Sequence, residues 1–283
     1  MFLKYIDSVA QKYKNIKYMQ DLNEYVSNMS LTIFEKINKC VEKKYYNSEN
    51  IGISQCMLQM ALDKMLSVHL LLTNKHNISE KIDVCHYQST YSIVRSLYEL
   101  LLLHHSIFVN PTRTEETDFL RNLWIVKSLN NRINYGSEKM CENDVVEKKK
   151  CKINIEESSI FTNFFNKEEV KRAYESDKHG YFQLNIDGGC YHLRTISFSD
   201  RGLFDKVINS SYETQMMYSN KNMIYDYISA NSHPTYLSVL QFGQQSSMDE
   251  KMFYFPLQIT VLLVWCFMNH FDLVVERYGE KDA

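Results

Sequence analysis

Two charged residues stand inside one strongly apolar helical stretch, and they are the first candidates for chemistry. The stretch reads Tyr91-Ser-Ile-Val-Arg95-Ser-Leu-Tyr-Glu99-Leu-Leu-Leu-Leu-His104-His105. Since a helix turns by about 100° per residue, Arg95 and Glu99 lie about 40° apart on one face. Leucines cover the other sides, so we expect the pair to be at least partly buried, where charges must be paired and hydrogen-bonded. The pair is therefore either a structural tie between helices or the polar floor of a site.

A second polar cluster lies far along the chain, at Tyr225-Asp-Tyr-Ile-Ser229-Ala-Asn-Ser-His233-Pro234. On a helix, Tyr225, Ser229 and Ser232 would share one face. His233 precedes a proline, which pushes its backbone towards an extended conformation at the helix end. Imidazole is the side chain best suited to proton transfer near neutral pH, so His233 is a candidate acid or base. The alternative is that His233 only caps the helix or ties down the turn at Pro234.

Together the two clusters resemble a poorly characterised family of bacterial helical domains of unknown function. That family has an Arg-(x)3-Glu helix and, about 130 residues further on, a Ser-(x)3-His segment. The matching positions in this chain are Arg95, Glu99, Tyr225, Ser229 and His233, within a match over roughly residues 50–275. The resemblance implies a helical bundle and brings no established reaction.

More distantly, the helical pattern is similar to the higher eukaryotes and prokaryotes nucleotide-binding (HEPN) domains. Many of these are metal-independent ribonucleases of toxin and phage-defence systems that act as dimers. Their signature is an arginine, four to six residues, and then a histidine that moves a proton at the 2′-hydroxyl while the arginine stabilises the phosphate. The resemblance implies RNA as substrate, a homodimer or larger homo-oligomer, and control by a regulatory protein partner.

The chain departs from the HEPN signature around Arg95. His104 follows after eight residues and lies about 180° away around the helix, and His105 lies about 80° off. The formal match is Arg172-Ala-Tyr-Glu-Ser-Asp-Lys-His179, whose ends converge if the segment is helical. A match of this length also arises by chance, so Arg172 and His179 are minor candidates.

The sharpest function that these residues permit is metal-independent RNA cleavage. His233 would be the acid or base, Arg95 would bind the phosphate, and Glu99 would orient Arg95. Tyr225 and Ser229 would complete the same pocket between two helices. The alternative is a non-catalytic binding or assembly module, in which the same side chains form an interhelical hydrogen-bond network.

No metal and no cofactor are expected. His69 with His76, or His104 and His105 with Glu99, could supply ligands, but no H-x3-H or H-E-x-x-H spacing makes such a site specific. The chain also lacks a P-loop, a G-x-G-x-x-G motif and a G-x-S-x-G motif, which argues against ATPases, Rossmann enzymes and α/β-hydrolases.

The composition predicts a mainly helical protein of the cytoplasm. Only 3 prolines and 8 glycines occur in 283 residues, and 45% of the residues are hydrophobic, enough for a sizeable core. A net charge of −2 argues against a globally basic nucleic-acid surface, although it leaves room for a local groove. The 7 scattered cysteines form no C-x-x-C pair, which predicts free thiols in a reducing compartment. The amino terminus turns polar too early for a signal peptide.

We predict an all-α (mainly) fold, a helical bundle with a small β-hairpin insertion near residues 181–198. The hairpin follows from alternating residues around Asp187-Gly-Gly189. One domain covers residues 1–283, with an N-terminal helical extension over 1–50 and a charged exposed segment or linker over 136–159. Helices are expected at about 54–72, around Arg95 as far as Pro111, at about 114–133 and 203–232, and at the carboxy terminus, with a polar connection over 74–83.

Residues 253–268 approach the length of a membrane span. A spanning helix needs about 20 predominantly apolar residues, and here Pro256 opens the run while Gln258 and Thr260 interrupt it. The sequence therefore predicts a buried core helix whose apolar run ends at Asn269-His270, with a membrane anchor as the minor alternative.

Overall fold

The computed structural model describes residues 18–45, 48–74, 76–79, 82–84, 86–135, 138–160, 183–186, 189–192, 225–233, 236–243 and 253–279. The chain divides into two compact units. The first unit comprises Met1–Leu101 and Phe204–Ala283, and the second comprises Leu102–Leu203. The prediction of a single domain over residues 1–283 stays a prediction.

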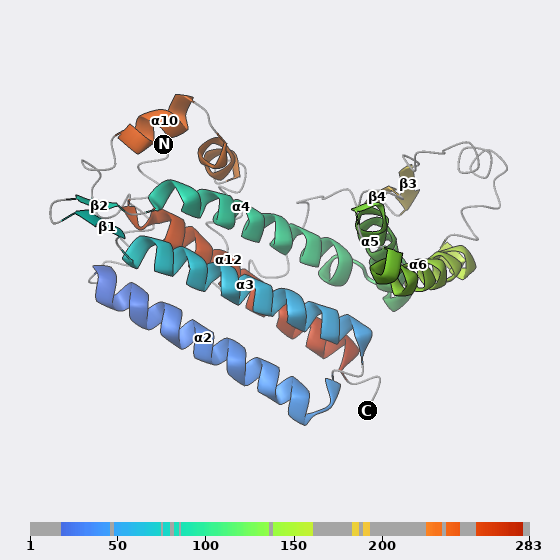
Figure 1. Ribbon diagram of the computed structural model, residues 1–283. Coiled ribbons are helices and arrows are strands. Elements are labelled where there is room, and N and C mark those ends of the chain that lie inside the picture. The colour runs from blue at the N-terminus through green and yellow to red at the C-terminus, as the bar shows by residue number, and fades with distance from the viewer. Residues whose placement is uncertain are drawn as a thin grey trace. The chain divides into compact units, whose positions relative to one another are not determined.

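The first unit is built on three long helices that pack side by side (Figure 1). They are α2 (Tyr18–Glu42), α3 (Glu49–Thr73) and α12 (Phe255–Tyr278). On α2 the buried positions recur at helical spacing, through Met29, Ile33 and Ile37, so one stripe faces the core. The described residues are mainly helical, which confirms the predicted all-α bundle.

Helix α3 ends close to the predicted residue 72 but begins at Glu49, five residues before the predicted start, and the sequence predicted its inner face only in part. Met65 and Val68 are buried as expected. The spacing of apolar residues over 54–72 also predicts Cys56 and Met60 on this inner face, but both are exposed. Apolar residues surround α3 on nearly all sides, so hydrophobicity alone does not tell which side faces the core.

Helix α12 is the core helix of the first unit. Leu263, Val264, Cys266 and Phe267 are all fully buried. The helix is long and apolar enough to cross a membrane, and 67% of its most apolar window is buried inside the protein. The apolar run was expected to end at Asn269-His270. His270 is itself buried, and Phe271 and Val274 extend the buried stripe of the helix, which continues to Tyr278.

Two more elements of the first unit position the polar clusters. Helix α4 (Tyr87–His104) carries Arg95 and Glu99, and its Ser96 hydroxyl accepts a 2.7 Å hydrogen bond from the Lys64 ammonium group of α3. Residues 225–232 are helical, with His233 in the turn that follows, and α10 (Tyr236–Gly243) comes next. The earlier part of the helix predicted at 203–232, residues 203–224, lies outside the described residues.

A short hairpin stands where the sequence predicted a polar connection at 74–83. It pairs β1 (His76–Ser79) with β2 (Ile82–Val84), antiparallel and with an irregular register. Strands of four and three residues are too short for a clear alternation of polar and apolar side chains, which explains why the pattern was missed.

The second unit pairs α5 (Thr114–Tyr135) with α6 (Glu138–Glu157). The segment before α5 is the π-helical η2 (His105–Val109), so the helix of Arg95 ends at the predicted Asn110-Pro111. The predicted charged segment 136–159 contains the helix α6, which is not wholly exposed, since Cys151 and Ile155 are buried. The predicted hairpin near 181–198 is confirmed by β3 (Gln183–Ile186) and β4 (Gly189–His192), paired antiparallel.

Candidate functional site

Arg95 is the centre of the polar cluster on α4. Its Nε atom donates a 2.9 Å hydrogen bond to Oε1 of Glu99, one turn further along the helix. This hydrogen bond raises the pKa of Arg95, an effect that partial burial opposes. The predicted Arg95–Glu99 pair is therefore formed, and it leaves the Nη1 atom of Arg95 turned towards another helix.

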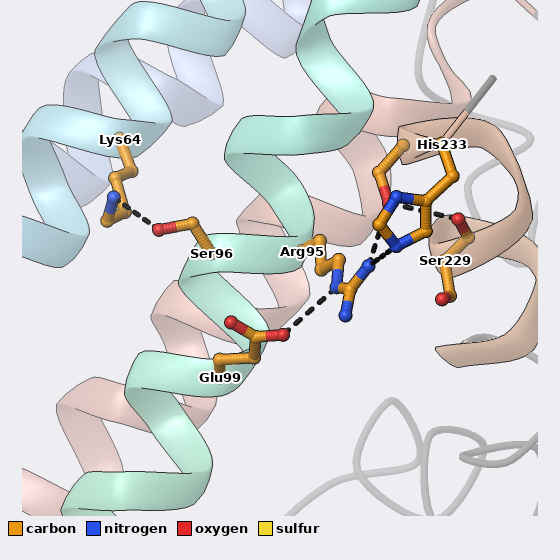
Figure 2. Close-up of polar contacts among 7 residues, drawn as sticks. Lys64, Arg95, Ser96, Glu99, Ser229 and His233 are labelled. Atoms are coloured by element: carbon orange, nitrogen blue, oxygen red, sulfur yellow. Dashed lines mark hydrogen bonds and ion pairs between the residues drawn. The ribbon is translucent and has the colours of Figure 1, made fainter.

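His233 meets that Nη1 atom from the end of the helix at 225–232, as Figure 2 shows. A guanidinium group only donates hydrogen bonds, so Nε2 of His233 accepts. This arrangement corresponds to the tautomer of a neutral imidazole in which Nδ1 carries the proton. The structure thus brings together two residues that are 138 positions apart in the sequence.

The other predicted residues lie around this contact. The ring of Tyr225 packs on Tyr98 of α4 at 5.3 Å between centroids, and the nearby Tyr225 adds to the rise in the pKa of Arg95. The backbone oxygen of Ser229 accepts a 3.0 Å hydrogen bond from the Ser232 hydroxyl, which in turn accepts from Nη1 of Arg95 at 3.4 Å (Figure 2). Ser229 therefore contributes to the cluster through its backbone.

The site is more open than the sequence predicted. The Arg95 side chain is 25% exposed, but the Glu99 side chain is 48% exposed, and His233 is exposed as well. The pair was expected to be at least partly buried, which holds for Arg95 but not for Glu99, because the leucines cover other faces of α4 and leave the face of Glu99 to solvent. A partly exposed cationic group beside an exposed imidazole can receive an anion from solution.

The sequence did not point to the residues that hold His233 in place. Its carbonyl oxygen accepts a 2.8 Å hydrogen bond from the Ser238 hydroxyl of α10. The helix at 225–232 is hydrogen-bonded to α4 through Gln88 and through the pair of Tyr91 and Tyr227. The available signal was the spacing of tyrosines, four apart on α4 and two apart at 225–227, which looked like ordinary core packing.

Several other candidates are not part of this cluster. Arg172 and His179 lie outside the described residues. His104 and His105 are buried, and the ring of His104 packs on Phe108 at 5.4 Å. His69 is hydrogen-bonded to Asn23 of α2, and burial lowers its pKa. Among the described residues, no three histidine, cysteine or acidic side chains are grouped to hold a metal ion.

Unfolding measurements on Arg95 and Glu99 will separate a site from a structural tie. Since Glu99 is nearly half exposed, we expect a double-mutant cycle with Arg95→Met and Glu99→Gln to give a coupling of only about 0.3–0.5 kcal/mol in the free energy of unfolding. Urea denaturation of the four proteins measures it. A coupling of about 2 kcal/mol or more would mean that the pair is mainly a structural tie.

Comparisons with protein-family models, with curated proteins and with solved structures gave no match for this chain. What the chain does is therefore inferred from the side chains that meet at Arg95.

Proposed function

We propose that this protein cleaves RNA without a metal ion, at the site formed by Arg95 and His233. The observation that carries the proposal is the direct contact between the guanidinium group of Arg95 and the Nε2 atom of His233, on a side of the protein where the His233 ring is exposed. Phosphodiester cleavage needs these two groups, one to take a proton and one to neutralise the charge that develops on the phosphate.

The reaction follows from the two groups. A phosphate of the RNA backbone binds Arg95 and takes over the hydrogen bond that Nη1 makes with His233. The freed Nε2 atom accepts the proton of the neighbouring 2′-hydroxyl, and the 2′-oxygen attacks the phosphorus. The bond to the 5′-oxygen breaks, and this leaving oxygen takes a proton from solvent. The products are a 2′,3′-cyclic phosphate and a 5′-hydroxyl end.

The remaining residues of the cluster prepare Arg95 for this role. Glu99 holds Nε and so fixes the plane of the guanidinium group. The Ser232 hydroxyl of the helix at 225–232 accepts a further hydrogen bond from Arg95, and the nearby Tyr225 raises the pKa of Arg95. Arginine presents several donors in one plane, so it can keep Glu99 while it binds two phosphate oxygens.

The resemblance to HEPN ribonucleases supplies the biological setting of the proposal. We expect a cytoplasmic toxin or phage-defence effector, acting as a homodimer or larger homo-oligomer, with a regulatory protein partner. An exposed site suits single-stranded RNA, whose phosphates and 2′-hydroxyls are accessible without opening a duplex.

A second candidate is the non-catalytic binding or assembly module. It is favoured by the exposed apolar side chains of α10, where Tyr236 is 78% exposed and Val239 is 63% exposed. In that case Arg95 and His233 only join α4 to the helix at 225–232.

Cleavage of RNA by the purified protein in excess EDTA tests the proposal. A mixed pool of total RNA is the substrate, and the chemistry of the product ends is determined. We expect fragments with 2′,3′-cyclic phosphates and 5′-hydroxyls, at a rate that EDTA does not change. RNA that stays intact, also after candidate partners are added, would favour the binding module.

A further inference from the structure

The helix that leads to His233 is held on α4 by a chain of tyrosine hydroxyl groups. Tyr87 and Tyr91 of α4 are fully buried, and their hydroxyl oxygens lie 2.7 Å apart and are hydrogen-bonded. The Tyr91 hydroxyl is also hydrogen-bonded to that of Tyr227, 3.3 Å away. The three hydroxyls form a chain from the interior of the first unit to the helix at 225–232.

The aromatic rings follow the same route. The rings of Tyr91 and Tyr227 meet edge to face at 5.7 Å between centroids, and Tyr227 meets Phe255, the first residue of α12, at 5.4 Å. Burial raises the pKa of Tyr91 well above its ordinary value, and the neighbouring Tyr227 and Tyr87 act in the same direction. The Tyr91 phenol therefore stays protonated near neutral pH and keeps its hydrogen bonds to Tyr87 and Tyr227.

Gln88, the residue after Tyr87 on α4, attaches the helix at 225–232 to α4 at a second point. Its Nε2 atom donates a 2.6 Å hydrogen bond to the carbonyl oxygen of Asn231, two residues before His233. The Asn231 side chain donates at 2.9 Å to the carbonyl oxygen of Tyr227. The backbone next to His233 is thus attached to α4 at a point that does not involve Arg95.

We propose that Tyr91 and Tyr227, with Gln88, are positioning residues that set the distance between His233 and Arg95. Arg95 follows Tyr91 by one turn on the same face of α4, so a shift of the helix at 225–232 past Tyr91 moves His233 relative to Arg95. A displacement of about 1 Å at a reacting group lowers the rate about 100-fold. The consequence for the rate rests on the proposed ribonuclease function, whereas the placement of His233 does not.

Tyr91→Phe tests this proposal, because it removes one hydroxyl and keeps the ring. We expect the ring ¹⁵N signals of His233 to shift or broaden in the substrate-free protein. In RNA cleavage we expect kcat to fall about ten-fold or more, with KM changed less than about two-fold. Tyr278→Phe is the matched control, because Tyr278 is also a buried tyrosine. It lies at the other end of α12 from Phe255, about 35 Å away along a helix of 24 residues. We expect this variant to leave both readouts unchanged.

The two readouts separate the outcomes. Unchanged His233 signals and unchanged kcat in folded Tyr91→Phe would overturn the proposal, and so would equal changes in Tyr278→Phe. If the wild-type protein cleaves no RNA, the proposed function fails while the His233 signals still decide the positioning role. If Tyr91→Phe does not fold, Tyr227→Phe carries the same test, since the Tyr227 ring is only half-buried.

Discussion

His233→Ala should abolish most of the RNA cleavage and leave the fold intact. The exposed ring of His233 is the proposed proton acceptor, and general acid–base catalysis by one side chain contributes about 10²–10⁴-fold to a rate. We therefore expect kcat to fall by about that factor, with little loss of stability because an exposed ring is removed. Initial rates on a labelled oligoribonucleotide in EDTA measure the effect, and circular dichroism checks the fold.

The matched control for this variant is His86→Ala. His86 is an exposed histidine of the same unit and lies just before α4, and its backbone carbonyl, not its ring, accepts the hydrogen bond from Ser89. We expect its cleavage rate to equal that of the wild type. A His233→Ala protein as active as His86→Ala would remove His233 from the site.

Phe267→Ala should destabilise the protein by about 3–5 kcal/mol. Phe267 is fully buried at the centre of α12, where removal of a ring leaves a cavity that the packed helices α2 and α3 cannot fill. Urea denaturation, followed by circular dichroism, measures the free energy of unfolding. This variant tests the assignment of α12 as a core helix.

Phe34→Ala on α2 is the control, because Phe34 is the same residue type in the same unit but is 56% exposed. Its substitution should change the free energy of unfolding by no more than about 0.5 kcal/mol. Equal, small effects of both variants would contradict the core position of α12 and would favour its insertion into a membrane.

Helical periodicity predicted most of the fold and one chemical pattern predicted the centre of the site. The spacing of apolar residues placed α3, α4, α5 and α12, because a buried stripe repeats along a helix. The same spacing could not choose the inner face of α3, whose apolar residues surround the helix. The pairing of Arg95 with Glu99 was predictable because it depends only on helix geometry within α4.

The approach of His233 to Arg95 was a hypothesis from resemblance, since a contact between distant segments depends on tertiary packing. Its attachments were missed for the same reason. Tyr91 and Tyr227 look like core residues in the sequence, and only packing brings their hydroxyl groups together. The exposure of Glu99 could not be predicted from the sequence either. Its apolar neighbours suggested burial, but a helix can bury one face and leave the next face to solvent.

The most direct test of the account is whether RNA binds at the contact between Arg95 and His233. A single-stranded oligonucleotide with 2′-O-methyl groups on every ribose cannot be cleaved, so it can be titrated into ¹⁵N-histidine-labelled protein whether or not the protein has been activated. We predict a saturable shift of the His233 ring signals, with the His86 signals unchanged, and loss of that shift in Arg95→Ala. Binding of the oligonucleotide without any change at His233 would contradict the account.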